Sequence, residues 1–171
     1  MRSLIRKRLL GIEGKVFKTS FRSSSSGALR MHEGHHGSCL CGEIRYEISA
    51  ELKALTHCHC RRCQKAHGAA FATYASVPAA SLRVSANGNA LRLYESETGV
   101  KRQFCGACGS SLFWSDPHGA YPDWISVAVA TLDTEFKPHK QQHGYRETRF
   151  DWLVLPDCVE PTGFERPTGP E

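Results

Sequence analysis

Residues 57–71 read HCHCRRCQKAHGAAF, and the three cysteines of this segment, Cys58, Cys60 and Cys63, follow the spacing C-x-C-x2-C. Thiols this close in the chain cannot usefully pair with one another as disulfides, but they can converge on one metal ion. Four further cysteines occur as two short pairs, Cys39 with Cys41 and Cys105 with Cys108. Four thiolates around zinc make a closed structural site, whereas three protein ligands leave one position open. We therefore expect two Zn2+ per chain, one that holds the fold and one that takes part in chemistry.

Residues 105–109 read CGACG, which is typical of a zinc knuckle. The two thiolates of a knuckle grip one ion, and its glycines let backbone amides turn towards the sulfur atoms. A closed site needs a second pair of thiols, and Cys39 with Cys41 is the free pair. Spacing alone leaves an alternative open, in which Cys58 and Cys60 complete this site.

Length and composition indicate one globular domain with a tail at each end. The chain has 171 residues, of which 40% are apolar, and no apolar run reaches the roughly 18 residues that a membrane span needs. We assign a basic, Ser-rich tail to residues 1–34, a zinc-binding catalytic domain to residues 35–156 and a Pro-rich tail to residues 157–171. The cysteine pairs suit chelation better than a disulfide scaffold, so we expect a reducing, cytoplasmic location. Cys158 stands alone and is expected to be a plain thiol.

Positive charge is confined to the N-terminal tail. Residues 1–30 carry eight Lys/Arg and one acid, whereas the rest of the chain has a net charge of −2. The domain is therefore not expected to bind nucleic acid. A tail rich in Arg and Ser is typical of a transit peptide, which would make the protein mitochondrial. The alternative is an upstream extension, with Met31 as the true start.

Short strands are expected throughout the domain. Ile44, Tyr46 and Ile48 alternate with charged residues, which predicts a half-buried strand. Residues 61–67 are expected to form one helical turn that Gly68 ends. Further strands are expected at residues 70–77, 82–84, 91–94, 100–104, 112–114 and 124–129, with edge pieces at 140–143 and 152–155. The polar residues before the first cysteine are expected to form a flexible lead-in, with histidines at His32, His35 and His36. The pattern predicts an all-β fold of short antiparallel strands with one helical turn.

The donor set of the three-cysteine segment favours the capture of a thiol. Zinc with three thiolates is anionic, which makes it a weak electrophile for activating water, but coordination still removes the proton of an added thiol. Arg61, Arg62 and Lys65 would offset the added anion and hold an anionic substrate. The alternative for these three residues is that they are solvated loop charges.

His57, His59 and His67 flank the thiols, and His59 is the first candidate among them for a fourth zinc ligand or a proton donor. The alternative is that these histidines only support the metal ligands or face solvent.

Four segments make the chain resemble the glutathione-dependent formaldehyde-activating enzyme family, which also includes centromere protein V. They are residues 37–42 (GSCLCG), residues 58–63 with 68–71 (CHCRRC and GAAF), residues 102–110 (RQFCGACGS), and residues 131–133 (TLD) with Trp152 downstream. The match runs from about residue 37 to residue 156 and leaves out the N-terminal tail. Seven cysteines in this order and spacing are highly specific for the family.

The resemblance implies a tent-like β fold built around zinc. It implies that the structural zinc is held by Cys39, Cys41, Cys105 and Cys108. It implies that the catalytic zinc is held by Cys58, Cys60 and Cys63. The implied reaction joins formaldehyde to glutathione and gives S-(hydroxymethyl)glutathione, as a carbon–sulfur lyase.

We therefore expect a zinc-dependent carbon–sulfur lyase that acts on a small thiol such as glutathione and on an aldehyde or its S-conjugate. Matching metal ligands identify the fold more firmly than the substrate. The alternative is a non-enzymatic, zinc-stabilised binding module, as the centromere relative suggests, which would use the basic tail to bind an acidic partner. An enzyme would depend on Cys60, whereas a binding module would depend on residues 1–30.

Overall fold

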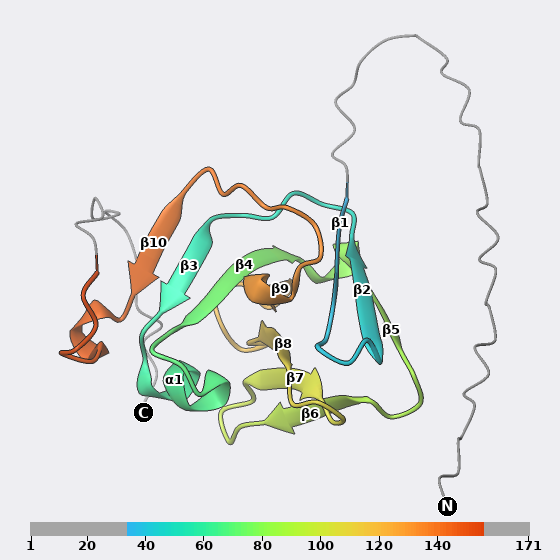
Figure 1. Cartoon of the computed structure of the whole chain (residues 1–171), viewed down its shortest axis with the longest axis horizontal. Coiled ribbons are helices and arrows are strands. Elements are labelled where there is room, and N and C mark those ends of the chain that lie inside the picture. The colour runs from blue at the N-terminus through green and yellow to red at the C-terminus, as the bar shows by residue number, and fades with distance from the viewer. Residues whose placement is uncertain (1–33, 156–171) are drawn as a thin grey trace, which may run out of the picture. The chain divides into compact units, whose positions relative to one another are not determined.

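Ten strands, one α-helix and three 3₁₀ turns make up residues 34–155, the part of the chain that this computed structural model describes (Figure 1). The strands are β1 (His35–Ser38), β2 (Ile44–Ile48), β3 (Leu55–Cys58), β4 (Ala72–Pro78), β5 (Leu82–Ala86), β6 (Leu91–Glu95), β7 (Lys101–Cys105), β8 (Ser111–Ser115), β9 (Trp124–Ala128) and β10 (Gln141–Gly144). The helical elements are α1 (Arg61–His67) and the turns η1 (Ala79–Ser81), η2 (Val129–Thr131) and η3 (Arg146–Thr148). Within these residues no helix has the length and apolar character to span a bilayer.

The strands form two sheets. The smaller sheet has the order β1-β2-β5, and the larger has the order β10-β3-β4-β9-β8-β7-β6. Figure 1 shows the smaller sheet beside the larger one, with α1 near the ends of β3 and β4. The all-β expectation is confirmed. One pairing differs from the expected antiparallel pattern, because β10 runs parallel to β3.

The main core joins side chains of both sheets. In β2 the side chains of Ile44, Tyr46 and Ile48 are buried, and they alternate with exposed residues, as the sequence pattern predicts. They form one cluster with buried residues of β4, β8 and β9. The ring of Tyr46 meets the ring of Phe113 edge to face, with centroids 5.2 Å apart. An aromatic pair of this geometry adds about 0.5–1.5 kcal/mol beyond the area it buries.

Helix α1 is short because both of its ends are specified by sequence. Cys60 is the N-cap, and its side chain accepts a hydrogen bond from the backbone N–H of Cys63. Gly68 is the C-cap and has φ 59°, a left-handed conformation that glycine adopts without steric cost. The predicted helical turn over residues 61–67, ended by Gly68, is therefore confirmed.

Two local expectations differ from the structure. His35 and His36 belong to strand β1, which pairs with β2, so they are not a flexible lead-in. Residues 152–155 form no strand, because the chain turns there after η3. In each case the partner strand decides the outcome, and local sequence does not reveal the partner.

Several predictions concern residues outside the described range. They include the transit-like or upstream tail before residue 34, His32, Cys158 and the Pro-rich tail from residue 157. The assigned domain boundaries stay predictions as well.

Candidate metal centre

Two groups of cysteine thiols converge in the described part of the chain. In each group the sulfur atoms lie within 4.8 Å of one another. The first group has four members, Cys39, Cys41, Cys105 and Cys108. The second has three, Cys58, Cys60 and Cys63. The thiols thus gather as four plus three, and Cys58 and Cys60 do not join the knuckle.

The four-thiol cluster links the two sheets. Cys39 and Cys41 lie in the turn between β1 and β2 of the smaller sheet, whereas Cys105 ends β7 of the larger sheet. Each pair sits in a tight turn that a glycine closes, and Gly42 and Gly109 have φ values of 80° and 78°. A group that binds all four sulfur atoms would therefore hold one sheet against the other.

Hydrogen bonds shape both halves of the four-thiol cluster. The backbone N–H of Ile44 donates to Cys39 Sγ at 3.3 Å. Ser110 spans the two halves, because its hydroxyl accepts from the backbone N–H of Leu40 at 3.0 Å and lies 3.2 Å from Cys108 Sγ. The Ser110 hydroxyl, followed by the Ser110 backbone N–H, lowers the pKa of Cys108 to about 5. These contacts favour the thiolate form, which is the form that binds metal.

The sulfur positions fit a tetrahedral zinc ion. Zn–S bonds of about 2.3 Å at tetrahedral angles place neighbouring sulfur atoms about 3.8 Å apart. The Sγ atoms of Cys41 and Cys105 lie 3.8 Å apart, and those of Cys39 and Cys41 lie 3.5 Å apart. The Sγ atoms of Cys58 and Cys60 also lie 3.5 Å apart. All seven described cysteines are free thiols, so the residues present fit a metal in both clusters.

The three-thiol cluster lies where β3 runs into α1. Cys63 is 6% exposed, whereas Cys58 and Cys60 are only partly buried, so the cluster is partly accessible to solvent. The side chains of Cys58 and Cys63, followed by backbone N–H groups, hold the pKa of Cys60 well below its ordinary value. The contact with Cys60 raises the pKa of Cys58, and the contacts with Cys58 and Cys60 raise the pKa of Cys63. The cluster therefore releases one proton readily, and the other two leave when a cation takes their place.

His59, the predicted proton donor, points away from solvent. Its side chain is 0% exposed, and its Nε2 lies 2.8 Å from Nδ1 of His143 in β10. Burial, followed by the nearby His143, lowers the pKa of His59 to about 4. The neutral ring stacks on His143, with centroids 5.1 Å apart, and packs against Phe71 at the same centroid distance. The contact ties the three-cysteine loop to β10, and the proton-donor role of His59 stays a prediction.

Sequence reasoning missed Tyr74, which packs against the three thiols from β4. It belongs to the same buried cluster as Cys63. Its hydroxyl lies 2.6 Å from Nε2 of His67, at the end of α1. Burial raises the pKa of Tyr74, so the hydroxyl keeps its proton. Arg102 of β7 acts electrostatically on both Tyr74 and His67, and its buried Nε has no hydrogen-bond partner among residues 34–155.

The three predicted substrate-binding cations lie on or near the exposed surface of α1. Arg61, Arg62 and Lys65 are all exposed. The Arg61 guanidinium lies 5.1 Å from the centroid of the Phe150 ring and donates to Gln64 Oε1 at 2.7 Å. Arg62 and Lys65 have no hydrogen-bond or ion-pair partner within residues 34–155. The cations therefore lie exposed on the helix that begins at the three-cysteine segment, and their contact with substrate stays a prediction.

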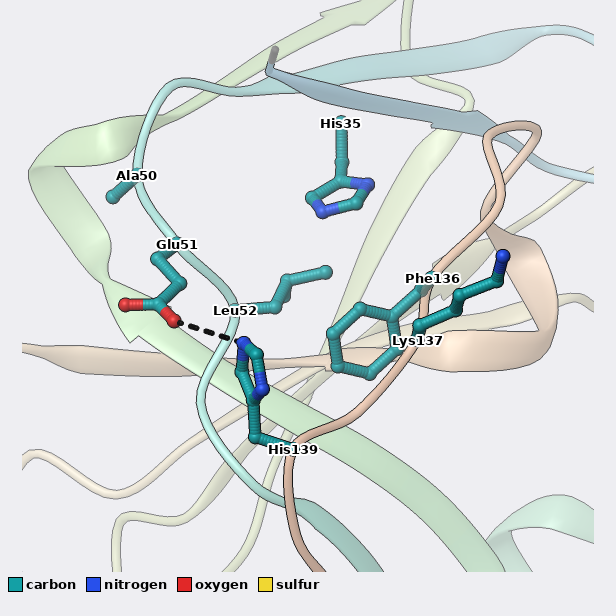
Figure 2. Close-up of a pocket in the computed structure, with 7 residues that line it drawn as sticks. All are labelled: His35, Ala50, Glu51, Leu52, Phe136, Lys137 and His139. Atoms are coloured by element: carbon teal, nitrogen blue, oxygen red, sulfur yellow. Dashed lines mark ion pairs between the residues drawn. The ribbon is translucent and has the colours of Figure 1, made fainter. Parts of the chain in front are cut away.

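A separate hollow of about 180 Å³ lies away from both cysteine clusters. Figure 2 shows its lining, with His35, Glu51 and His139 around the apolar side chains of Leu52 and Phe136. The Glu51 carboxylate lies 3.8 Å from the ring of His139 and 3.3 Å from the ammonium group of Lys53. Its polar groups do not converge as metal ligands, since the two thiol clusters are the metal-type groups found within residues 34–155.

Comparisons with known proteins agree with this geometry. The family model described as "Glutathione-dependent formaldehyde-activating enzyme" matches residues 34–148. A protein of Phaeosphaeria nodorum named "Putative glutathione-dependent formaldehyde-activating enzyme" is 33% identical over 143 residues, which are 72% of this chain and 75% of that protein. An uncharacterized lyase of Schizosaccharomyces pombe is 30% identical over 130 residues, which are 74% of this chain and 84% of the lyase.

A solved structure is similar as well. The crystal structure of a Rhodobacter sphaeroides protein superposes with a TM-score of 0.50 at 28% sequence identity. The match covers 59% of this chain and 90% of the other chain. The shared fold therefore includes most of that protein and most of the residues described here.

Proposed function

Because the chain belongs to the glutathione-dependent formaldehyde-activating enzyme family, we propose that it is a zinc-dependent carbon–sulfur lyase. The substrates would be a small thiol, glutathione or a close analogue, and formaldehyde or a related aldehyde. The product would be an S-(hydroxymethyl) conjugate, and cleavage of its C–S bond is the reverse reaction. The observation that carries the proposal is a three-thiol cluster that is partly accessible to solvent and separate from a complete four-thiol cluster.

Cys58, Cys60 and Cys63 would hold the zinc that takes part in chemistry, and the other four described cysteines would hold a structural zinc. A zinc ion with three protein thiolates keeps one position open and supplies a means to hold an incoming thiol in its deprotonated, nucleophilic form. Arg61 and Lys65 offset the negative charge that gathers there. Both residues belong to α1, which begins directly after Cys60, so the positive charge follows the thiolates in the same part of the chain.

The reaction forms one C–S bond and moves one proton. The substrate sulfur attacks the carbonyl carbon, the carbonyl electron pair moves to oxygen, and that oxygen takes up a proton. We propose that the Tyr74 hydroxyl delivers the proton, and that the proton released by the substrate thiol passes through His67, 2.6 Å away, to restore that hydroxyl. Tyr74 packs against Cys63, whereas His59 is enclosed by His143 and Phe71. His59 would then position the loop through its hydrogen bond to His143.

Zinc content and turnover of Cys60→Ser test the proposal. The variant is expected to bind one zinc per chain instead of two, and to lose turnover of glutathione with formaldehyde. The four-thiol cluster is untouched in this variant, so the domain stays folded and the loss of activity is not a folding defect. A variant with two bound zinc ions and unchanged turnover would show the proposal to be wrong.

The binding-module alternative relies on residues 1–30, which lie outside the described range. It predicts that removal of these residues abolishes binding to an acidic partner and that Cys60→Ser leaves that binding intact. The lyase predicts the opposite dependence, so the two variants separate the two functions.

A further inference from the structure

Helix α1 has two faces with different partners. Cys60, Cys63 and His67 turn towards the buried cluster around Tyr74. Arg61, Gln64, Lys65 and Gly68 follow the spacing i, i+3, i+4, i+7, which places them together on another side of the helix. Because Cys60 and Arg61 are consecutive, the two faces meet at the first turn of the helix.

The face that carries Arg61 lines a groove of about 280 Å³. Arg61 and Lys65 stand on the helix side, Phe150 and Trp152 stand on the other side, and residues 68–70 complete the lining. The rings of Phe150 and Trp152 stack, with centroids 4.9 Å apart and an interplanar angle of 15°. Trp152 is nevertheless 68% exposed, so the stack presents an uncovered aromatic surface to the groove. We call these two rings the aromatic shelf.

The cationic side of the groove is held in place from below. Gln64 is 3% exposed, and its Nε2 donates to the carbonyl oxygens of Ala70 at 3.2 Å and Thr148 at 3.3 Å. These two bonds orient Gln64 Oε1 towards Arg61, which donates to it at 2.7 Å. A guanidinium group has five N–H donors, so several remain for a ligand. Among residues 34–155, no carboxylate lines the groove and Lys65 has no hydrogen-bond or ion-pair partner.

We propose that this groove binds the carboxylate-bearing, peptide-like arm of the thiol substrate. The inference rests on the proposed function for the position of the sulfur atom, at the three-thiol cluster. Cations select a carboxylate, and a flat exposed aromatic shelf suits the planar amide groups of a peptide. The substrate class is then an anionic peptide thiol of the glutathione type, and not a small neutral thiol.

Such a substrate has the reach to occupy both faces of α1. The two faces meet at the consecutive residues Cys60 and Arg61, whose Cα atoms are about 3.8 Å apart. From its middle residue to either end, an extended tripeptide spans about 5–7 Å. A thiol in the middle residue can therefore lie at the three-thiol cluster while a carboxylate at an end of the chain reaches the side of the helix that carries Arg61.

Binding of S-methylglutathione to the full, zinc-loaded chain tests the groove alone. Its sulfur is blocked and cannot become a thiolate, so calorimetric titration reports on the arm. Lys65→Met and Trp152→Ala are each expected to weaken binding about tenfold, as the loss of one charge-assisted or stacking contact implies. Lys137→Met is the matched control, because Lys137 is an exposed lysine paired with Glu135 away from the groove. The affinity of Lys137→Met for S-methylglutathione is expected to equal that of the wild type.

The outcomes distinguish the groove from the proposed function. Wild-type binding that both groove variants weaken and Lys137→Met does not supports the groove, whether or not glutathione and formaldehyde turn over. Equal affinities in wild type, Lys65→Met and Trp152→Ala would overturn the groove, as would an absence of binding to wild type. If the wild type turns over glutathione and formaldehyde but shows one of these two binding results, the lyase function is supported and the role of the groove in substrate binding is refuted.

Discussion

Replacement of Cys105 by serine is expected to destabilise the domain severely. Cys105 is 0% exposed and ends a strand of the larger sheet, and its Sγ lies 3.8 Å from Cys41 Sγ in a turn of the smaller sheet. Serine is nearly the same size as cysteine, so the change removes a metal ligand and leaves the packing almost intact. The effect therefore measures how much the four-thiol cluster holds the two sheets together.

The magnitude follows from the number of ligands. Structural zinc sites contribute about 10–16 kcal/mol in zinc-finger peptides, so the loss of one ligand in four removes at least about 3 kcal/mol. For a domain of this size such a loss lowers the melting temperature by about 10 °C or more. If the whole ion is lost, the deficit equals or exceeds the total stability of a typical domain, about 5–15 kcal/mol, and the protein unfolds.

Thermal denaturation followed by circular dichroism, with zinc content by mass spectrometry, measures this effect. Cys60→Ser is the comparison variant, because its cluster connects only residues 58–63 and closes a short loop, so the shift in melting temperature is expected to be smaller. A soluble Cys105→Ser protein that melts with the wild type would refute the assignment of the structural cluster. A larger shift in Cys60→Ser than in Cys105→Ser would refute it as well.

Three further predictions concern single residues. Tyr74→Phe is expected to lower kcat for glutathione with formaldehyde about 100-fold or more, because the hydroxyl that lies 2.6 Å from His67 would be lost, and an unchanged kcat would exclude Tyr74 as the donor. Burial, followed by Arg102, lowers the pKa of His67 from its ordinary 6.5, so the unfolded chain binds a proton more readily than the folded one and stability falls as the pH drops below about 6.5. In urea titrations, the free energy of unfolding is expected to drop between pH 7.5 and pH 5.5 by a smaller amount in His67→Asn than in the wild type. The difference is at most about 1.4 kcal/mol per pH unit, and equal drops in the two proteins would contradict this. Gly37→Ala would place a methyl group against the ring of Tyr46 and the carbonyl oxygen of Thr131, so it is expected to cost about 1–3 kcal/mol in urea denaturation, and an unchanged midpoint would disprove the clash.

The parts of the fold that sequence predicts are those with a local cause. The alternation of Ile44, Tyr46 and Ile48 gives a strand with one buried face because successive side chains point to opposite sides. Gly68 ends α1 because the chain needs a left-handed residue there. Close spacing likewise keeps the thiols of each short cysteine segment together. The pairing of Cys39 and Cys41 with Cys105 and Cys108 joins distant segments, and spacing alone leaves it open.

The parts that sequence misses depend on distant partners. The polar strand β1 forms because it pairs with β2. Strand β10 pairs in parallel with β3, which lies more than eighty residues earlier in the chain. Tyr74 lies in a strand and does not resemble a site residue until the fold packs it beside Cys63 and places its hydroxyl next to His67. Phe150 and Trp152 meet Arg61 across almost ninety residues of sequence, so no local pattern announces the aromatic shelf.

The central claim is that the three-cysteine cluster holds a zinc ion with a position left for the substrate sulfur. X-ray absorption at the zinc edge measures the sulfur ligands directly, on zinc-loaded protein before and after the addition of glutathione. Before the addition, we expect an average of about 3.5 sulfur ligands per zinc, from one four-thiol and one three-thiol site. Saturating glutathione is predicted to raise this average to four, and Cys60→Ser is predicted to show no rise. An average of four sulfur ligands before the addition, or no change after it, would contradict the account.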